Sequence, residues 1–364
     1  MKHLLLFLLL VSCSQPQLIS PKTTTTAPTP LDPQKPIVEA FPEGFHSGVC
    51  YAHAWEDAND GGYGTDKDLK TLQRLKDIGV NWISLTPFAF QRTKTSEKIT
   101  GTTAKMNRAE SDERIKASAK FAKQLGIKVM LKPHVWVGDS SWCGAIRPPD
   151  WGVWMASYKD VVIHYAKLAQ EIEADGYLIG NELGTATKAD PEGFREFIKE
   201  ARTYYKGPIS YAANWDEAER VPFWDDLDAI GINAYWPLTK TKNASEEDLY
   251  QGALKVDSRL ATLSQKTNRA ILLTEIGYRS VIDSAVDPNT WPEHDQDRQI
   301  DYEAQSRAYR AVLKAFTNKP YIRGIYFWKV ISDGEWREDG GERGFSPLDK
   351  PAEKVLREYF KPGD

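Results

Sequence analysis

Two glutamates in matching surroundings are the residues of this sequence best suited to chemistry. Glu182 follows Leu178-Ile179-Gly180-Asn181, and Glu275 follows Ile271-Leu272-Leu273-Thr274, so each ends a mainly apolar strand. Two carboxyl groups about 5–5.5 Å apart can cleave a glycosidic bond by double displacement, because one attacks as an anion while the other donates a proton. Close like charges push their pKa values apart, which supports both protonation states in one site. Either glutamate alone could equally be a salt-bridge partner or a helix cap, so the prediction depends on the pair.

The pair needs a scaffold that brings strand ends together. From residue 44 onward, short apolar runs alternate with amphipathic helical patterns, which is typical of a parallel sheet with crossover helices. Expected strands are 48–55, 81–87, 128–135, 177–182, 209–213, 229–235, 270–278 and 322–328; expected helices are 66–78, 110–125, 153–174, 191–204, 246–264, 302–317 and 351–360, with a short irregular segment near 216–226. This pattern predicts an α/β fold, a (β/α)8 TIM barrel, as a single catalytic domain over residues 41–364. A doubly wound open sheet is the alternative, but Gly61–Gly64 lacks the spacing of its phosphate loop.

Polar and aromatic side chains gather at the carboxyl ends of the expected strands, where a barrel of this kind places its functional groups. Besides the two glutamates, the predicted substrate-binding set is His53, Trp55, His134, Trp136, Asn181, Asn214, Trp215, Tyr235, Trp236 and Trp328. Aromatic rings there can stack on the C–H faces of sugars. His53 and His134 could instead be satisfied core histidines. Trp142, Trp151, Trp154 and Trp291 are each expected to pack, although one or two of them should line outer subsites.

Several longer sequence segments resemble those of known glycoside hydrolases, and this resemblance makes the predicted function more specific. Asn181-Glu182 ending the fourth strand and Glu275 ending the seventh resemble the glycoside hydrolase clan A barrels. The strings 130–135, 179–182, 274–280 and 345–352 are similar to glycoside hydrolase family 113, and the likeness covers roughly residues 44–360. The family consists chiefly of β-1,4-mannanases, so the resemblance implies a retaining endo-β-1,4-mannanase acting on mannan or glucomannan.

The resemblance also implies roles for single residues. Glu182 would be the acid/base and Glu275 the nucleophile, Asn181 would bind the 2-hydroxyl of the reacting sugar, Tyr235 would orient the nucleophile, and Trp328 would floor the −1 subsite. The sequence departs from the clan at the end of the second strand, where 84–87 carries no arginine. Arg279 or His134 is the expected replacement as the group that supports the nucleophile. Open alternatives are the same mechanism on another β-glycan, an exo-acting β-mannosidase, and a non-catalytic glycan-binding lipoprotein.

The first residues predict export. A basic start and the apolar run 4–11 form a signal peptide over residues 1–12, too short to span a bilayer. The run ends in Leu10-Val11-Ser12-Cys13, which resembles a bacterial lipobox and implies lipidation of Cys13 after cleavage. Residues 13–40 are rich in Ser, Thr and Pro and should form an extended tether. The expected location is a bacterial membrane, most simply the outer membrane or cell surface. By resemblance to Gram-negative lipoproteins, a residue other than Asp after the lipidated cysteine, here Ser14, implies sorting to the outer membrane.

Composition excludes several other classes. A formal charge of −4, with no basic arm, argues against a nucleic-acid partner. The six histidines show no metal-ligand spacing, and no Gly-x-Ser-x-Gly elbow supports an esterase, so neither a metal nor a cofactor is expected. The remaining partner is a β-linked glycan bound by what should be a monomer. Cys50 and Cys143 could form a disulfide after export or remain buried thiols.

Overall fold

The computed structural model describes residues 40–55, 59–102, 110–291 and 297–361. The predicted signal peptide, Cys13 and the tether up to residue 39 lie outside the described residues, so their predictions stand untested. No helix among the described residues has the length and apolar character needed to cross a membrane.

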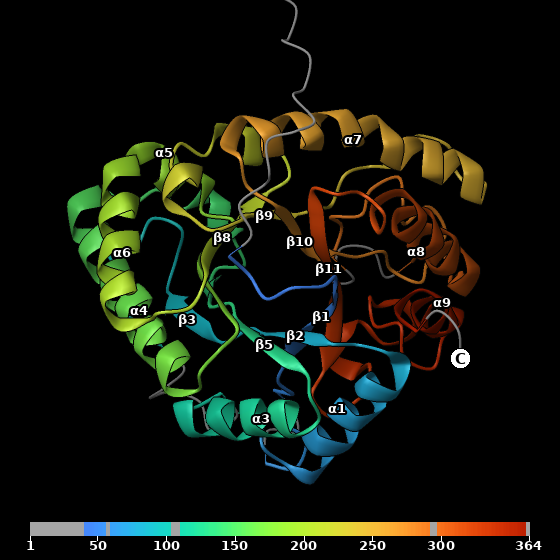
Figure 1. The fold of residues 1–364 in the computed structure, drawn as a ribbon, viewed down its shortest axis with the longest axis horizontal. Helices are drawn as coiled ribbons and strands as arrows, with labels where there is room; N and C mark the ends of the chain where they lie inside the picture. The colour runs from blue at the N-terminus through green and yellow to red at the C-terminus, as the bar shows by residue number, and fades with distance from the viewer. Residues whose placement is uncertain (1–39, 56–58, 103–109, 292–296, 362–364) are drawn as a thin grey trace, which may run out of the picture. The chain divides into compact units, whose positions relative to one another are not determined.

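Parallel strands close into an eight-stranded barrel, which confirms the predicted (β/α)8 class (Figure 1). The strands run around the barrel in the order β1-β11-β10-β9-β8-β7-β5-β2. Their bounds are β1 His46–Ala52, β2 Trp82–Leu85, β5 Lys128–Leu131, β7 Gly176–Asn181, β8 Ile209–Asn214, β9 Ile230–Asn233, β10 Ile271–Ile276 and β11 Ile322–Ile331. Both ends of each strand lie within three residues of the predicted ends, except the carboxyl end of β5.

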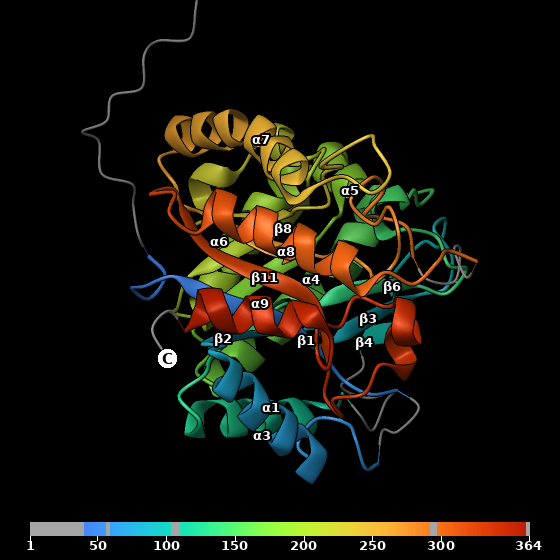
Figure 2. The same cartoon turned by 90° about the vertical axis from the view of Figure 1, so that its right-hand side faces the viewer.

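The strand predicted over 128–135 is wrong in its extent. Pro133 cannot donate to a strand ladder and separates β5 from β6, His134–Val137. The strand β6 pairs instead with β3, Phe88–Gln91, in a small sheet that β4, Gly101–Thr102, completes in the order β4-β3-β6. Figure 2 shows this sheet beyond one end of the barrel strands, where it extends the surface around the barrel mouth.

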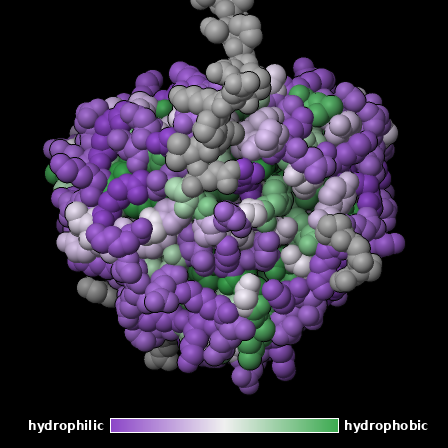
Figure 3. All heavy atoms as spheres, viewed as in Figure 1, coloured by the Kyte–Doolittle hydropathy of each residue, from purple (hydrophilic) through white to green (hydrophobic). Residues whose placement is uncertain are grey.

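Helices surround the barrel and bury their apolar stripes against it. Their bounds are α1 Asp66–Ile78, α3 Asp112–Gln124, α4 Trp151–Glu171, α5 Gly184–Ala189, α6 Pro191–Tyr204, α7 Glu246–Thr267, α8 Tyr302–Phe316 and α9 Pro351–Phe360, and short 3₁₀ turns replace a helix between β8 and β9. Side-chain caps mark the starts of these helices except α5 and α9. Ser245, for example, forms a capping box with Asp248 at the start of α7. Hydrophilic residues cover most of the outer rim in the view of Figure 3.

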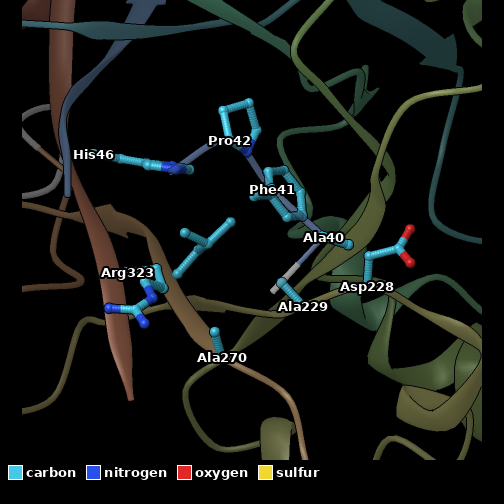
Figure 4. A pocket seen from close by; sticks show the side chains of 9 residues that line it. Ala40, Phe41, Pro42, His46, Asp228, Ala229, Ala270 and Arg323 are labelled. Carbon is cyan, nitrogen blue, oxygen red and sulfur yellow. The ribbon is translucent and has the colours of Figure 1, made fainter. Parts of the chain in front are cut away.

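Strand alternation separates an inner from an outer core. On β1 and β2, Cys50 and Trp82 belong to the cluster inside the barrel, whereas Val49 and Ile83 belong to the cluster between strands and helices. The amino end of the barrel is closed by His46, which stacks on Trp82 with ring centroids 3.9 Å apart. A small pocket at the amino end of the barrel is lined by His46 and by residues such as Ala40, Pro42 and Arg323 (Figure 4). It lies at the opposite end of the strands from both glutamates.

Gly48 shows how tightly the inner core is packed. A Cβ at this position would lie 2.4 Å from the Tyr326 ring, whose hydroxyl is 2.9 Å from Nδ1 of His46. We predict that Gly48→Ala lowers the free energy of unfolding by about 1–3 kcal/mol, because the enclosed ring must shift. Gly152→Ala, at an exposed site in the first turn of α4, is the control and should change stability by less than about 0.5 kcal/mol. Equal effects of the two substitutions in urea unfolding would contradict this packing.

Candidate active site

Irregular strand pairing changes the direction of the side chains at the ends of the two strands that carry the glutamates. The register of β10 against β9 shifts between Leu273 and Glu275, so that Glu275 pairs with Asn233. Without the shift, Glu275 would follow the alternation of Leu273, which faces the helices. The register of β7 against β8 shifts in the same way between Leu178 and Asn181. Such irregularities re-aim side chains, and here each one comes directly before a residue of the predicted pair.

Glu275 is buried and held by a cation and a phenol. Its Oε1 accepts a hydrogen bond from Nζ of Lys132 at 2.6 Å, and its Oε2 accepts one from the hydroxyl of Tyr235 at 2.9 Å. Lys132 is fully buried and also donates to the backbone oxygen of Thr274 at 3.2 Å. Burial opposes the lysine charge, but its neighbours Cys50 and Glu275 keep the pKa of Lys132 above its ordinary value. The carboxyl group of Glu275 is therefore placed where a negative charge is favoured.

Among the described residues, the hydrogen-bond donors that hold the side chain of Glu182 are neutral. Its Oε1 accepts from Nδ2 of Asn233 at 2.9 Å, and its Oε2 accepts from Nε1 of Trp142 at 2.7 Å. The residue sits directly after β7 with a φ of 54°, in the left-handed region. A non-glycine residue costs about 1–2 kcal/mol there. Backbone strain of this kind concentrates at functional sites.

The surroundings of Glu182 favour its protonated form. Burial, followed by the charge of Glu275, raises the pKa of Glu182 to about 7. The bonds from Asn233 and Trp142 act in the opposite direction, because both stabilise the charged form. At neutral pH a substantial fraction of Glu182 is therefore protonated beside a Glu275 that is paired with Lys132. An ionised and a protonated carboxyl group in one site are what double displacement needs.

Asn233 connects the two strands that carry the pair. Its Nδ2 donates to Glu182 and, at 3.0 Å, to Oδ1 of Asn181, while its Oδ1 accepts from the hydroxyl of Thr274 at 2.9 Å. Asn181 also lies 3.4 Å from Nδ1 of His134. This chain of side chains fixes the orientation of Asn181 at the centre of the mouth.

Aromatic rings surround the carboxyl groups. His134 stacks on Trp328 with centroids 5.8 Å apart, and its Nε2 lies 3.7 Å from Oε1 of Glu275. Burial, with the nearby Lys132 charge, lowers the pKa of His134 well below its ordinary value, so the ring is neutral. Trp291 packs edge-on against Trp328. Among the described residues, four exposed tryptophans provide ring surface to solvent: Trp55, Trp136, Trp142 and Trp291.

Four residues of the predicted substrate-binding set make contacts away from the two glutamates. His53 is 1% exposed and lies with Nδ1 2.6 Å from Oε1 of Glu110, so it supports the ring of Trp55 rather than facing solvent. The side-chain amide of Asn214 donates to Asp216 within its own turn. Trp215 and Trp236 line a small cavity against α7, and Trp236 is 5% exposed. Packing against a helix accounts for this position of Trp236, and the structure gives no support to its use as a sugar platform.

Three contacts of the glutamates were not predicted. Lys132, not the expected Arg279 or His134, forms the close ion pair with Glu275. The sequence signal was the Lys132-Pro133 pair, because the proline ends β5 and leaves the lysine at the strand end. Asn233 ends β9 and is absent from the predicted substrate-binding set, and Trp142 is among the tryptophans expected mainly to pack. Packing is correct for the fully buried Trp154, whose ring Trp151 contacts.

Cys50 and Cys143 are free thiols and do not form the disulfide that was one of the two alternatives. The Sγ of Cys50 lies inside the barrel, 3.5 Å from Nζ of Lys132. Among the described residues no group of three or more His, Cys, Asp or Glu side chains is arranged to hold a metal ion.

Comparison with known proteins agrees with this geometry. The family model of Glycoside Hydrolase Family 113 matches residues 51–348. The structure is similar to the GH113 β-mannanase AaManA from Alicyclobacillus acidocaldarius in complex with ManMIm, with a TM-score of 0.76, 26% identity, and coverage of 88% of this chain and 99% of that one. A GH113 β-1,4-mannanase complex gives a TM-score of 0.74 at 22% identity, covering 88% and 100% of the two chains. A Faecalibacterium prausnitzii β-glucuronidase gives 0.59 at 14% identity over 88% of this chain and 49% of that one, which shows the shared fold. No curated protein matches the sequence significantly.

The charge on Glu275 is one of two causes of the raised pKa of Glu182, and the two can be separated. We predict that Glu275→Gln lowers the pKa of Glu182 from about 7, because the repulsion is removed. Burial remains, so the value should stay above that of an ordinary glutamate. Carbon-13 NMR titration of labelled glutamate carboxyl groups, assigned with Glu182→Gln, measures the change. Glu217→Gln, at another buried carboxyl group, is the control and should leave Glu182 unchanged; an unaltered titration in Glu275→Gln would contradict the coupling.

Proposed function

The chain belongs to glycoside hydrolase family 113, and on this premise we propose that it cleaves β-1,4-mannosidic bonds of mannan or glucomannan with retention of configuration. The observation that carries the proposal is the unequal support of two carboxyl groups at one barrel mouth. Glu275 contacts a buried lysine and a tyrosine hydroxyl, whereas Glu182 is held by neutral donors with its pKa at about 7. The substrate follows from the relatives, since two structurally similar members of the family are described as β-mannanases.

In the first proposed step, the carboxylate of Glu275 attacks the anomeric carbon of the reacting sugar. The bond from that carbon to the glycosidic oxygen breaks, and Glu182 gives its proton to this oxygen as the leaving sugar departs. The product is a glycosyl ester on Glu275 and an anionic Glu182. Tyr235, which donates to the second oxygen of Glu275, orients the attacking group.

In the second step, Glu182 takes a proton from a water molecule, whose oxygen attacks the same anomeric carbon. The ester bond breaks, Glu275 leaves as a carboxylate beside Lys132, and Glu182 is protonated again. Two inversions give net retention. Asn181 accepts a hydrogen bond from Asn233. In the proposed mechanism Asn181 binds the 2-hydroxyl group of the reacting sugar, and Trp328 forms the floor of the −1 subsite.

Assay of purified protein on mannan, glucomannan, xylan and cellulose tests the substrate. We expect release of manno-oligosaccharides from the first two polymers. Cleavage of another β-glycan alone would keep the mechanism and replace the substrate, release of single mannose units would indicate exo action, and tight glycan binding without turnover would favour a binding protein.

Replacing the two glutamates tests their roles. Glu275→Ala and Glu182→Gln should each reduce turnover by about 10³-fold or more, because each removes a group that acts in the transition state. Azide should restore turnover to Glu275→Ala with an activated aryl mannoside and give the inverted glycosyl azide, since the small anion fills the space of the missing carboxylate. Failure of azide to rescue this variant would count against Glu275 as the nucleophile.

We further propose that the enzyme is exported and held at a bacterial membrane by lipid on Cys13, where a tether over residues 13–40 would carry the barrel. Cys13→Ala should move the protein from the membrane fraction to the soluble fraction of the cells, with activity on soluble mannan retained. Ser14→Ala keeps the lipidated cysteine and is the matched control for membrane attachment. Unchanged fractionation of Cys13→Ala would exclude this anchor.

A further inference from the structure

We propose that Trp142 is a positioning residue for the acid/base group, holding Glu182 by its indole N–H and stabilising the negative charge that Glu182 gains on proton transfer. The inference rests on the proposed function and extends it by a residue outside the two glutamates and their strands. The contact is direct, because Nε1 of Trp142 donates to Oε2 of Glu182 at 2.7 Å. The ring is 48% exposed, so the contact is made at the edge of the mouth.

The turn that carries Trp142 is built around this contact. Trp142 precedes the 3₁₀ turn η1, Cys143–Ala145, and its ring lies over Gly144, where a Cβ would be 2.4 Å from the ring atom Cζ2. The hydroxyl of Thr185 donates to the backbone oxygens of Gly144 at 3.0 Å and Ile146 at 2.7 Å.

Thr185 belongs to α5, which begins two residues after Glu182. The turn is therefore tied to the segment that follows the glutamate, while its tryptophan binds the glutamate side chain. Cys143 adds a third connection, since its Sγ lies 3.6 Å from the backbone oxygen of Asn181. Trp142 and Glu182 consequently have a fixed relative position in which the N–H points at one carboxyl oxygen.

The bond strengthens during the first chemical step. Glu182 starts that step protonated and ends it as an anion, and an N–H bond to an anion is roughly twice as strong as one to a neutral acceptor. An interaction that is stronger in the transition state than in the ground state accelerates the reaction. The oxygen Oε1 has the same kind of support from Asn233, so both oxygens are prepared to carry charge.

The second step has the opposite requirement. Glu182 begins it as an anion and accepts a proton from water, so the N–H of Trp142 stabilises the starting state. Loss of this N–H should therefore slow formation of the glycosyl ester and should not slow its hydrolysis. A residue that only packed the loop, or only stacked on a sugar, would give no such difference between the steps.

Trp142→Phe tests the proposal because it retains an aromatic ring and removes the donor. NMR titration of Glu182 without any substrate should give a pKa above the wild-type value, because a bond to the charged form is lost. Trp136→Phe is the matched control: Trp136 is 50% exposed, packs edge-on against Phe88, and should leave the Glu182 titration unchanged. This measurement does not depend on mannanase activity, so it separates failure of this proposal from failure of the proposed function.

Kinetics provide the second measurement. For a manno-oligosaccharide, whose leaving group needs the proton, Trp142→Phe should reduce the rate of ester formation by about 10- to 100-fold, the range expected for a hydrogen bond to a charged group. A dinitrophenyl mannoside needs no proton, and its first step should change less than about 3-fold. The alkaline limb of kcat/KM for the oligosaccharide should move to higher pH.

Gly144→Ala provides an independent variant, which retains the indole but forces the ring from its place. It should also raise the pKa of Glu182, and it should slow ester formation more for the manno-oligosaccharide than for the dinitrophenyl mannoside. An unchanged or lowered pKa in both variants, or equal rate losses for the two substrates, would overturn the proposal. If Trp142→Phe does not fold, the result for Gly144→Ala decides.

Discussion

The buried ion pair between Lys132 and Glu275 is the interaction on which the rest of the site depends. A carboxyl group inside a barrel is costly to ionise unless a cation lies beside it, and here the lysine Nζ is 2.6 Å away. Removing one partner of such a pair typically costs about 3–5 kcal/mol, because the other charge stays buried. Lys132 also binds the backbone oxygen of Thr274, at the irregular point of β10 that re-aims Glu275. One side chain thus supports both the charge and the direction of the carboxyl group.

The properties of Glu182 follow from that charge. A protonated carboxyl group at neutral pH requires an environment that disfavours the anion, and burial beside an ionised Glu275 provides it. Neutral N–H donors at both oxygens keep the proton transferable, since they favour the charged form. The strained backbone at Glu182 places this side chain against its donors. Two chemically identical groups therefore have different surroundings, and in the proposed mechanism they have different roles.

The fold could be predicted from the sequence because its signals are local. Helices such as Asp66–Ile78 carry their caps and apolar stripes in the sequence, and strand ends are visible where apolar runs stop. Strand-end position alone identified Glu182, Glu275, Asn181 and Tyr235 as neighbours, and the structure brings them together.

The remaining parts of the site depend on tertiary packing. The register shifts of β7 and β10 arise between strands and leave no local pattern. Lys132 lay within a strand predicted to continue to residue 135, which hid its place at a strand end. Trp236 and Trp142 follow strands in similar ways, yet one packs on α7 and the other binds Glu182, a difference decided by the turns that carry them. The folded structure distinguishes such residues, and their local sequence does not.

The stereochemistry of the first-formed product tests the central claim most directly. Proton NMR during early hydrolysis of a β-linked manno-oligosaccharide, recorded before mutarotation, reports the anomer that the enzyme releases. Attack by an ionised Glu275, followed by water activated by Glu182, requires the β-anomer to appear first. Initial release of the α-anomer would show a single displacement by water and would contradict the assignment of Glu275 as the attacking group.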